Sequence, residues 1–267
     1  MKKEKREVEL MAMSMPEIEK NLEALRLHGM RATLQARVLQ ANQGEISFLE
    51  AFSWLLQDEL DCRQSRLIER RFKASGLDER KIMSEFDWRF NPKLPKKEIF
   101  DLVCLKFLQN GEDALLIGSP GTGKSHIAKA IAHAAIQACH HVAYRQAHVF
   151  FADIFEATQI GKRQKVNKHF TEPDLLIIDD LFLRKKMTED AADDLLDIIL
   201  DRYTKRKSTL ITSNRPIEDW GNLLKDNAAS SAILDRLLHR GHLLQFEGKS
   251  YRLKEASKRL VSMKNRK

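Results

Sequence analysis

The sequence has few cysteines and no long hydrophobic run. Cys62, Cys104 and Cys139 lie far apart and form no CxxC pair, which argues against a disulfide framework or a zinc ribbon. No stretch approaches the ~18 consecutive apolar residues that a transmembrane helix needs. The N-terminal residues MKKEKREVEL are charged and lack the apolar core of a secretory signal. We therefore expect a cytoplasmic protein that does not enter a membrane.

Positive charge is in excess, with a formal net charge of +8 and a pI near 9.3. One basic stretch, residues 249–267, contains Glu255 as its only acid. A second basic stretch contains no acid, and its cations are Lys162, Arg163, Lys165 and Lys168. Such patches favour contact with a polyanion such as double-stranded DNA. A solvated basic segment would have the same composition.

Residues 15–90 predict a small all-α domain. Pro16 begins a helix whose apolar residues continue at helical spacing as far as Leu34, and the sequence NQG ends it. Ser47 and Glu50 have the spacing of a capping box at the start of another helix. This segment is therefore expected to bind DNA or a protein partner through helix surfaces.

Three arginines of that later helix share one face because they are three and four residues apart. They are Arg63, Arg66 and Arg70. Two interpretations remain open. The stripe would grip DNA phosphates, or it would pair with the acids around it as a solvated face.

Residues 91–97, NPKLPKK, predict a linker because they contain two prolines and no periodicity. After it, through residue 248, short apolar runs alternate with longer helical stretches. The expected strands are Ala114–Ile117, Val142–Tyr144, Leu175–Ile178, Thr209–Thr212 and Leu243–Phe246. Runs that are apolar on both faces favour parallel strands. The pattern predicts a three-layer α/β/α fold with helices on both faces of a parallel sheet.

A phosphate-binding motif follows the first expected strand. Its residues are Gly118, Ser119, Pro120, Gly121, Thr122, Gly123, Lys124 and Ser125, with His126 next. They fit the pattern G-x-x-x-x-G-K-[ST], and an amphipathic helix follows. The glycines let backbone N–H groups face phosphates, Lys124 supplies charge to the β- and γ-phosphates, and Ser125 offers a hydroxyl to Mg²⁺. The segment predicts ATP binding.

Acids end the third expected strand, at Asp179 and Asp180. Ligands bind at the carboxyl ends of parallel strands. Asp179 is therefore placed to bind Mg²⁺, and Asp180 to orient or deprotonate an attacking water. Asn214 ends the next strand, where it could position that water or simply form a turn before Arg-Pro.

Three segments together resemble the IstB-like ATP-binding proteins, which are transposition helper ATPases of insertion sequences. They are GSPGTGKSH, LLIIDDL, and STLITSNRPIEDW followed by ILDRLLHRGHLLQFEGKSYR. The N-terminal sequences LEALRLHGMRATL, DELDCRQSRLIERRFKASG and FDWRFNP fit as well. The resemblance covers about residues 15–255. It implies a relation to the DnaC helicase loaders and DnaA initiators within the AAA+ superfamily of P-loop NTPases.

The resemblance also implies roles for two arginines. Arg236 matches an arginine finger that reaches the ATP of a neighbouring subunit, and Arg252 matches a second sensor of phosphate in its own chain. In the domain division, residues 98–248 form the ATPase domain and 249–267 a basic tail that begins with this sensor. The implied partners are duplex DNA, a transposase and further copies of the chain in an ATP-dependent ring or helix.

The sequence departs from the family pattern at two positions. Phe182 stands where relatives often have glycine, and Asp180 stands where AAA+ enzymes commonly have glutamate, so slow hydrolysis is expected. Residues 1–14 lie outside the resemblance and are a leader of uncertain start. The candidate start residues are Met1, Met11, Met13 and Met15.

Three other functions use the same features. A helicase loader would bind a helicase through its N-terminal helices. A small-molecule kinase would use the same phosphate loop with an acceptor lid and no partner arginine. A plain DNA-binding protein would hold nucleotide only as a structural ligand.

Overall fold

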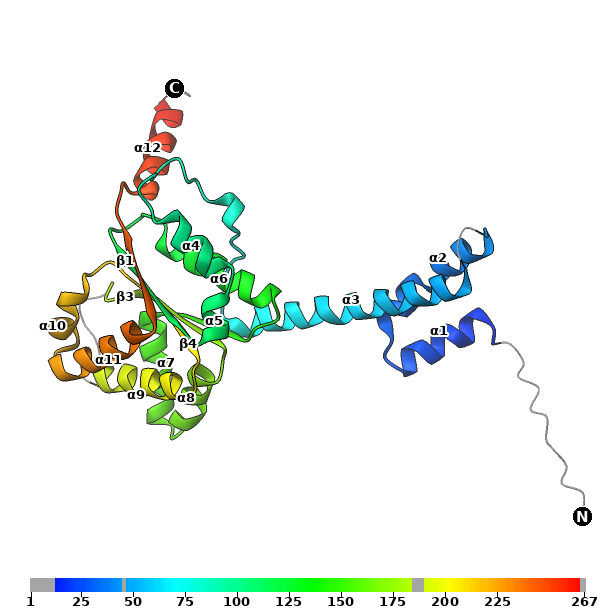
Figure 1. Ribbon diagram of the computed structural model, residues 1–267, viewed down its shortest axis with the longest axis horizontal. Helices are drawn as coiled ribbons and strands as arrows, with labels where there is room; N and C mark the ends of the chain where they lie inside the picture. The colour runs from blue at the N-terminus through cyan, green and yellow to red at the C-terminus, as the bar shows by residue number, and fades with distance from the viewer. Residues whose placement is uncertain (1–12, 45–46, 184–189, 265–267) are drawn as a thin grey trace, which may run out of the picture. The chain divides into compact units, whose positions relative to one another are not determined.

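The structure is a computed structural model that describes residues 13–44, 47–183 and 190–264. The chain forms two compact units, residues 1–69 and 70–267 (Figure 1). This division lies before the predicted linker at 91–97. Residues ahead of the predicted linker belong to the second unit because they contact its other residues. Lys129, for example, binds Asp78 and Glu79 at 2.8 and 3.0 Å.

The first unit contains α1 (Met15–Ala24), α2 (His28–Asn42) and the first part of α3 (Phe48–Ser75). The single helix predicted from Pro16 to the NQG sequence is wrong, because the chain turns between α1 and α2. Arg26 has a left-handed φ of 59° there, which a continuous helix does not allow.

Close contact between α2 and α3 depends on Gly29. A Cβ on this residue would lie 2.6 Å from the Cα of Glu59. The buried Glu59 carboxylate accepts hydrogen bonds from the backbone N–H groups of Gly29 and Met30 at 2.6 and 3.3 Å. It therefore caps the N-terminus of α2, where a negative charge is stabilised.

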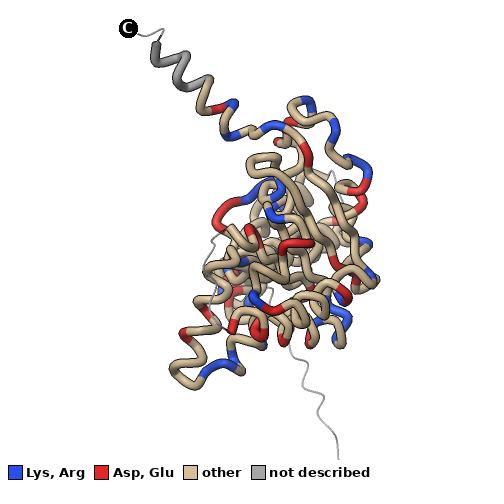
Figure 2. The backbone as a smooth tube through the Cα atoms, turned by 90° about the vertical axis from the view of Figure 1, so that its left-hand side faces the viewer, with Lys and Arg blue, Asp and Glu red and all other residues tan. Residues whose placement is uncertain are grey.

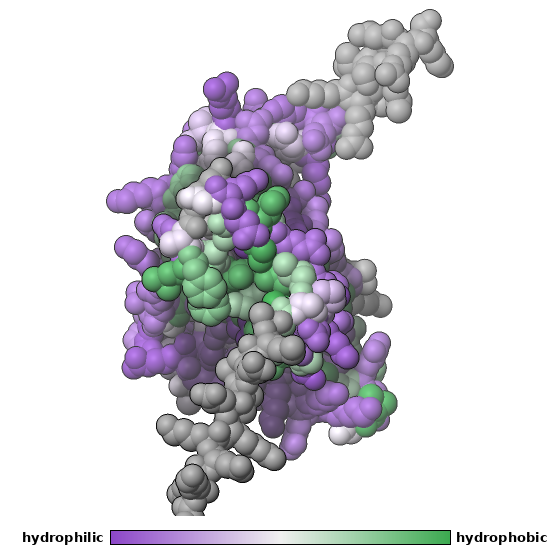
Figure 3. Space-filling model, turned by 90° about the vertical axis from the view of Figure 1, so that its right-hand side faces the viewer, coloured by the Kyte–Doolittle hydropathy of each residue, from purple (hydrophilic) through white to green (hydrophobic). Residues whose placement is uncertain are grey.

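The predicted capping box at the start of α3 is confirmed. The Ser47 N–H donates to Glu50 Oε2 at 2.7 Å, and the Glu50 N–H donates to Ser47 Oγ at 3.3 Å. Figure 3 shows hydrophobic side chains gathered on the face turned toward the viewer. The large exposed apolar residues of the first unit include Leu25, Leu39, Phe48, Leu49, Phe52, Leu56 and Leu60.

The second unit is built on a five-stranded parallel sheet. Its strands are β1 (Asp113–Gly118), β2 (Val142–Gln146), β3 (Leu175–Leu181), β4 (Ser208–Ser213) and β5 (Gly241–Phe246). Their order is β2-β3-β4-β1-β5. Every predicted strand is present, with bounds that differ by a few residues at most.

Helices cover both faces of the sheet (Figure 1). They are α4 (Lys96–Val103), α5 (Lys106–Asn110), α6 (Lys124–Gln137), α7 (Ala147–Gln159), α8 (Arg163–Thr171), α9 (Ala191–Thr204), α10 (Trp220–Leu224), α11 (Asn227–His239) and α12 (Tyr251–Lys264), with short 3₁₀ turns at Met83–Glu85 and Ile217–Asp219. Helices α4 and α6 lie on one face, and α7, α9 and α11 lie on the other. The predicted three-layer fold is confirmed.

The interior strand β3 is apolar at consecutive positions because both of its faces are covered. Leu176 and Ile178 pack with Phe150 and Leu195 in the core beneath α7 and α9. Leu175 and Ile177 are also fully buried. Both faces of the strand are therefore covered, as parallel sheets require.

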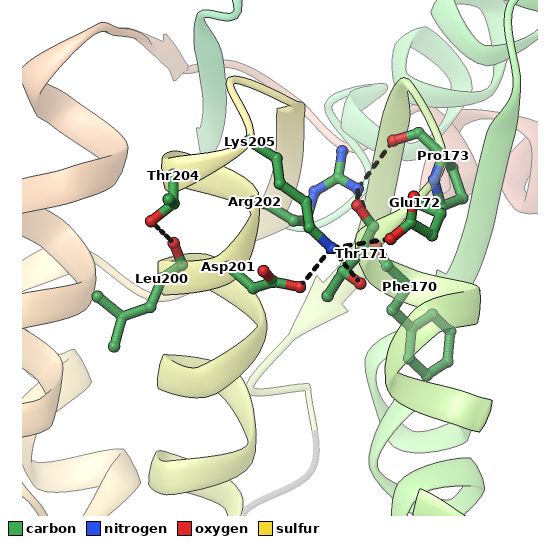
Figure 4. Close-up of polar contacts among 9 residues, drawn as sticks. All are labelled: Phe170, Thr171, Glu172, Pro173, Leu200, Asp201, Arg202, Thr204 and Lys205. Atoms are coloured by element: carbon green, nitrogen blue, oxygen red, sulfur yellow. Dashed lines mark hydrogen bonds and ion pairs between the residues drawn. The ribbon is translucent and has the colours of Figure 1, made fainter. Parts of the chain in front are cut away.

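Arg202 of α9 is fully buried at the end of the sheet where the strands begin (Figure 4). Its guanidinium donates to the carbonyls of Phe170 and Pro173 at 2.8 and 3.0 Å, and to that of Ser208. It also donates to Thr209 Oγ1 at 3.0 Å. Arg202 thus ties the end of α8 to the starts of β3 and β4.

Acidic and basic residues are interspersed over the second unit, and Lys and Arg cluster where the chain enters α12 (Figure 2). Within the residues searched, 13–44, 47–183 and 190–264, no helix combines the length and apolar character needed to span a membrane.

Candidate nucleotide-binding site

The predicted phosphate loop lies between β1 and α6, and its glycines are required by geometry. Gly118, Gly121 and Gly123 have φ angles of 147°, 77° and 106°, which residues with a Cβ rarely adopt. A Cβ on Gly118 would overlap the carbonyl oxygen of Phe246, and one on Gly123 would lie 2.5 Å from the ring of Phe86. Glycine is therefore required at these positions both by the backbone conformation and by the close packing of Phe246 and Phe86.

Lys124 begins α6 and is buried within the loop. Its Nζ donates to the carbonyl oxygens of Gly118 and Ser119 at 2.7 and 2.9 Å. Burial lowers the pKa of Lys124, while the nearby charges of Asp180 and Asp179 oppose that shift. The loop thus holds a cation at the N-terminus of a helix, where anions bind.

Asp179 is 2% exposed, and side chains from both neighbouring strands hold its carboxylate. The Tyr144 hydroxyl of β2 donates to Oδ2 at 2.7 Å, and the Thr212 hydroxyl of β4 donates to Oδ1. Burial, followed by the charge of Asp179, raises the pKa of Tyr144, so it stays a donor. Each carboxylate oxygen keeps a lone pair for a further partner.

Asp180 has a left-handed backbone, with φ 57°, at an irregularity in the β3–β4 pairing. Its N–H donates to Thr212 Oγ1 at 2.8 Å. Burial is the main cause that raises the pKa of the Asp180 carboxyl, and the adjacent Asp179 charge adds to it. A carboxylate with a raised pKa is a better proton acceptor near neutral pH.

Phe182 also adopts a left-handed conformation, with φ 64°. This backbone favours glycine, which agrees with the residue expected there from the family pattern. The side chain compensates by burial, since Phe182 is 2% exposed and its ring lies edge-on to Trp220 at 5.2 Å. The turn behind the acids is therefore preserved by core packing.

Asn214 follows β4, which pairs with β3 in the register Ile178 to Ile211. The predicted role of Asn214 required β4 to lie beside β3, and the two strands are neighbours in the sheet. The Asn214 Oδ1 atom is buried without a hydrogen-bond partner among the described residues. A buried amide oxygen without a partner is costly, so a ligand or water is expected to bind it.

One cleft of about 370 Å³ collects most of the predicted site residues. From the predicted set it is lined by Pro120, Gly121, Gly123, Lys124, Ser125, His126, Asp179, Asp180, Asn214 and Arg252. The lining residues that the sequence did not predict include Glu79, Lys81, Lys129, Gln146 and Tyr251. Lys129 is held by Asp78 and Glu79, so its charge is neutralised beside the cleft.

A second pocket of about 360 Å³ shares Gly123, His126 and Tyr251 with the cleft. Phe86 lines it, with its ring edge-on to His126 at 5.4 Å. Burial is the main cause that lowers the pKa of His126, which favours a neutral ring. A pocket with aromatic walls next to a phosphate loop suits a planar base.

Arg236 and the predicted DNA-binding residues do not line the cleft. Arg236 Nη1 donates to the Ala232 carbonyl of its own helix at 2.7 Å. On α8, Arg163 pairs with Asp194 and Asp197 at 2.9 and 3.2 Å. The remaining cations of this patch, Lys162, Lys165 and Lys168, are exposed.

In the first unit, Arg63 Nε donates to Glu59 Oε1 at 2.6 Å. This contact favours the structural interpretation for Arg63, because its charge is directed to an acid of the same helix. Arg66 and Arg70 are exposed on α3.

The residues fit ATP and Mg²⁺. The loop offers backbone donors and Lys124 to phosphates, and Ser125 and Asp179 offer oxygens to a hard cation. Asn214 has an acceptor that no described residue uses. Together with the sheet order, this arrangement defines a P-loop ATPase fold of the AAA+ type.

The chain belongs to the family described as IstB-like ATP binding protein, which it matches over residues 20–259. It is 32% identical, over 92% of its length, to an ATP-binding protein from an insertion sequence of Mycobacterium tuberculosis, covering 98% of that protein. It is also 32% identical to the ATP-binding protein of insertion sequence IS21 of Pseudomonas aeruginosa, covering 94% of each chain.

Solved structures with the same fold include the DnaC helicase loader, at 20% identity with a TM-score of 0.50. That match covers 67% of this chain and 99% of the loader. A DNA replication initiation factor gives a TM-score of 0.53 at 20% identity, covering 70% of this chain and 55% of the factor.

Proposed function

We propose that the protein binds ATP with Mg²⁺ in the cleft and hydrolyses it slowly, and that this cycle controls its assembly on double-stranded DNA and its action on a transposase. The observation that carries the proposal is the convergence on one cleft of a P-loop lysine, adjacent carboxylates and the Asn214 oxygen, which has no partner among the described residues. Family membership supports the link to insertion sequences.

In this proposal the phosphates lie on the loop and the base lies in the pocket beside Phe86 and His126. Ser125 and Asp179 would hold Mg²⁺, which would neutralise phosphate charge. Asp180 accepts a proton from the attacking water, and Asn214 orients that water through its free amide oxygen.

Assembly is proposed because Arg236 does not line the cleft of its own chain. A half-buried arginine on α11 is available to a neighbouring copy, whose active site it would complete. An active site shared between copies couples hydrolysis to assembly, in a ring or a helix.

Contact with duplex DNA is proposed for exposed cations of residues 162–168 and of the α3 arginine stripe, and their exposure supports it. They are Lys162, Lys165, Lys168, Arg66 and Arg70. Exposed apolar side chains of the first unit, such as Phe48 and Leu49, support contact with the transposase, because such patches mark protein-binding surfaces.

A helicase loader is the second candidate, because the DnaC loader shares the fold. The two candidates differ in their protein partner alone. A pull-down with the purified chain as bait, against the transposase and against a replicative helicase, separates them. Retention of the helicase and not the transposase would favour the loader.

The test of the proposed function is ATP turnover with and without duplex DNA, measured for the wild type, Asp180→Asn and Arg236→Ala. DNA should stimulate the wild type, and each variant should lose about tenfold or more of the turnover. Turnover per molecule should fall on dilution. ATP turnover per molecule that changes neither with DNA nor on dilution would contradict the proposal and favour a small-molecule kinase.

A further inference from the structure

One side chain, Asn91, holds the turn between β5 and α12. Its Oδ1 accepts from the Lys249 N–H at 3.0 Å, and its Nδ2 donates to the Lys249 carbonyl at 3.0 Å. Asn91 is 6% exposed. The Asn91 carboxamide therefore both accepts from and donates to the Lys249 backbone. Replacing Asn91 by alanine would remove both hydrogen bonds, and replacing it by aspartate would remove the donor.

Gly248 makes this contact possible. Its φ is 143°, in the region that favours glycine, and a Cβ there would lie 2.6 Å from Asn91 Cγ. The amide can thus lie directly against the backbone of the turn. The Asn91 carboxamide therefore holds the backbone of the turn directly.

The same turn is bonded to the phosphate loop. The Tyr251 N–H donates to the Gly121 carbonyl at 2.9 Å. A Cβ on Gly121 would overlap Ser250 Oγ. The position of the first turn of α12 is therefore linked to the backbone that would cradle the phosphates.

The segment 87–91 also holds the next turn of α12. Lys254 Nζ lies 3.0 Å from Asp87 Oδ2 and 4.4 Å from the centre of the Phe90 ring. The Phe90 ring meets Tyr251 edge-on at 5.3 Å. Leu253 is 69% exposed, so apolar burial does little to fix the start of this helix.

Arg252, between these contacts, lines the cleft together with Lys124. The positive charge of Arg252 acts on both Lys124 and Asp180. The two cations lie beside the Asp179 and Asp180 carboxylates in this cleft, and a further anion that contacts both cations lowers their mutual repulsion. A phosphate group of the nucleotide supplies that anion.

We propose that Asn91 is a positioning residue that places Arg252 against the terminal phosphate of ATP, and so sets how strongly the site prefers ATP to ADP. The inference rests on the proposed ATP binding and adds a determinant of its specificity. Asn91 lines the pocket proposed for the base and touches the turn at Gly248 and Lys249, and its effect on the terminal phosphate runs through α12.

The experiment measures dissociation constants for Mg-ATP and Mg-ADP by calorimetry on the full chain. The variants are Asn91→Ala, Asn91→Asp, Arg252→Ala and the double Asn91→Ala/Arg252→Ala. Each single variant should weaken ATP binding about 5- to 20-fold and ADP binding less than about twofold. In the Arg252→Ala background, Asn91→Ala should change the ATP constant no further.

Asn110→Ala is the matched control, because the Asn110 amide also bonds a nearby group, Glu112 Oε1 at 3.0 Å, at the opposite end of β1. It should leave both constants unchanged. Asn91→Asp, the same size as Asn91, provides a reading if Asn91→Ala does not fold.

Equal weakening of ATP and ADP binding, or additive effects with Arg252→Ala, would overturn the positioning role and leave Asn91 a structural residue. A wild-type chain without affinity for ATP would instead overturn the proposed function.

Discussion

At the scale of single residues, Thr212 connects the two acids of the site. Its hydroxyl donates to Asp179 and accepts from the Asp180 N–H. Because valine has the same shape without the hydroxyl, Thr212→Val should release both contacts with little change in packing. We expect Mg-dependent ATP turnover to fall about tenfold or more, with a smaller change in ATP affinity measured without Mg²⁺.

Thr204→Val is the control for this substitution, since Thr204 is exposed on α9 and its hydroxyl donates to the Leu200 carbonyl of its own helix. The control should keep wild-type turnover. If Thr212→Val also keeps it, the bridging hydroxyl has no part in orienting the acids.

At position 182 the left-handed backbone favours glycine, whereas packing in the core favours the phenylalanine ring. Replacing it by glycine relieves a left-handed φ, worth about 1 kcal/mol, but removes a buried ring whose loss costs about 3–5 kcal/mol. Phe182→Gly should therefore lower the free energy of unfolding by about 2–4 kcal/mol. Urea denaturation measures this, and an unchanged or higher midpoint would show that the ring does not compensate for the turn.

At the scale of elements, two buried charged side chains, Asp113 and Arg202, hydrogen-bond to residues at the start of the strands. Asp113 of β1 accepts from the Thr209 N–H of β4 at 2.6 Å, and its charge acts on Arg202. Burial is the main cause that raises the pKa of Asp113 to about 6 and lowers the pKa of Arg202 to about 9. Both groups are thus disfavoured as ions despite their attraction.

The sign of the pH dependence follows from the Asp113 pKa. Because it is raised on folding, its contribution to stability is present below pH 3.8 and lost as pH rises through about 6. Asp113→Asn keeps the acceptor oxygen without the charge. Its stability relative to wild type should increase by about 2–3 kcal/mol between pH 4 and pH 7, measured by urea denaturation. A difference that stays constant with pH would contradict the assigned pKa.

The elements of the second unit were predictable because parallel strands covered on both faces need consecutive apolar residues, as in β3. The break at Arg26 was not predictable, since the apolar spacing continues through it in the sequence. The same limit applies to the site. Lys124 and Asp179 belong to local motifs, whereas Tyr144 and Thr212 act across neighbouring strands and are recognisable only once the strand order is known.

At the scale of the whole molecule, a shared active site predicts complementation between inactive variants. Arg236→Ala keeps its own acids, and Asp180→Asn keeps the arginine that a neighbour would need. Equal amounts of the two, mixed before ATP and DNA are added, should recover about a quarter of wild-type turnover if copies assemble at random. Turnover that stays at the level of each variant alone would show that Arg236 does not act between copies.

Every step of the account requires that the cleft between β1, β3 and α12 hold Mg-ATP. Calorimetric titration of the wild-type chain and of Lys124→Ala with ATP, with and without Mg²⁺, measures this directly. The wild type should bind with Mg²⁺, and the variant should bind at least about tenfold more weakly, because a buried cation facing the phosphates is lost. A folded wild-type chain that shows no affinity for ATP in the presence of Mg²⁺ would contradict the account.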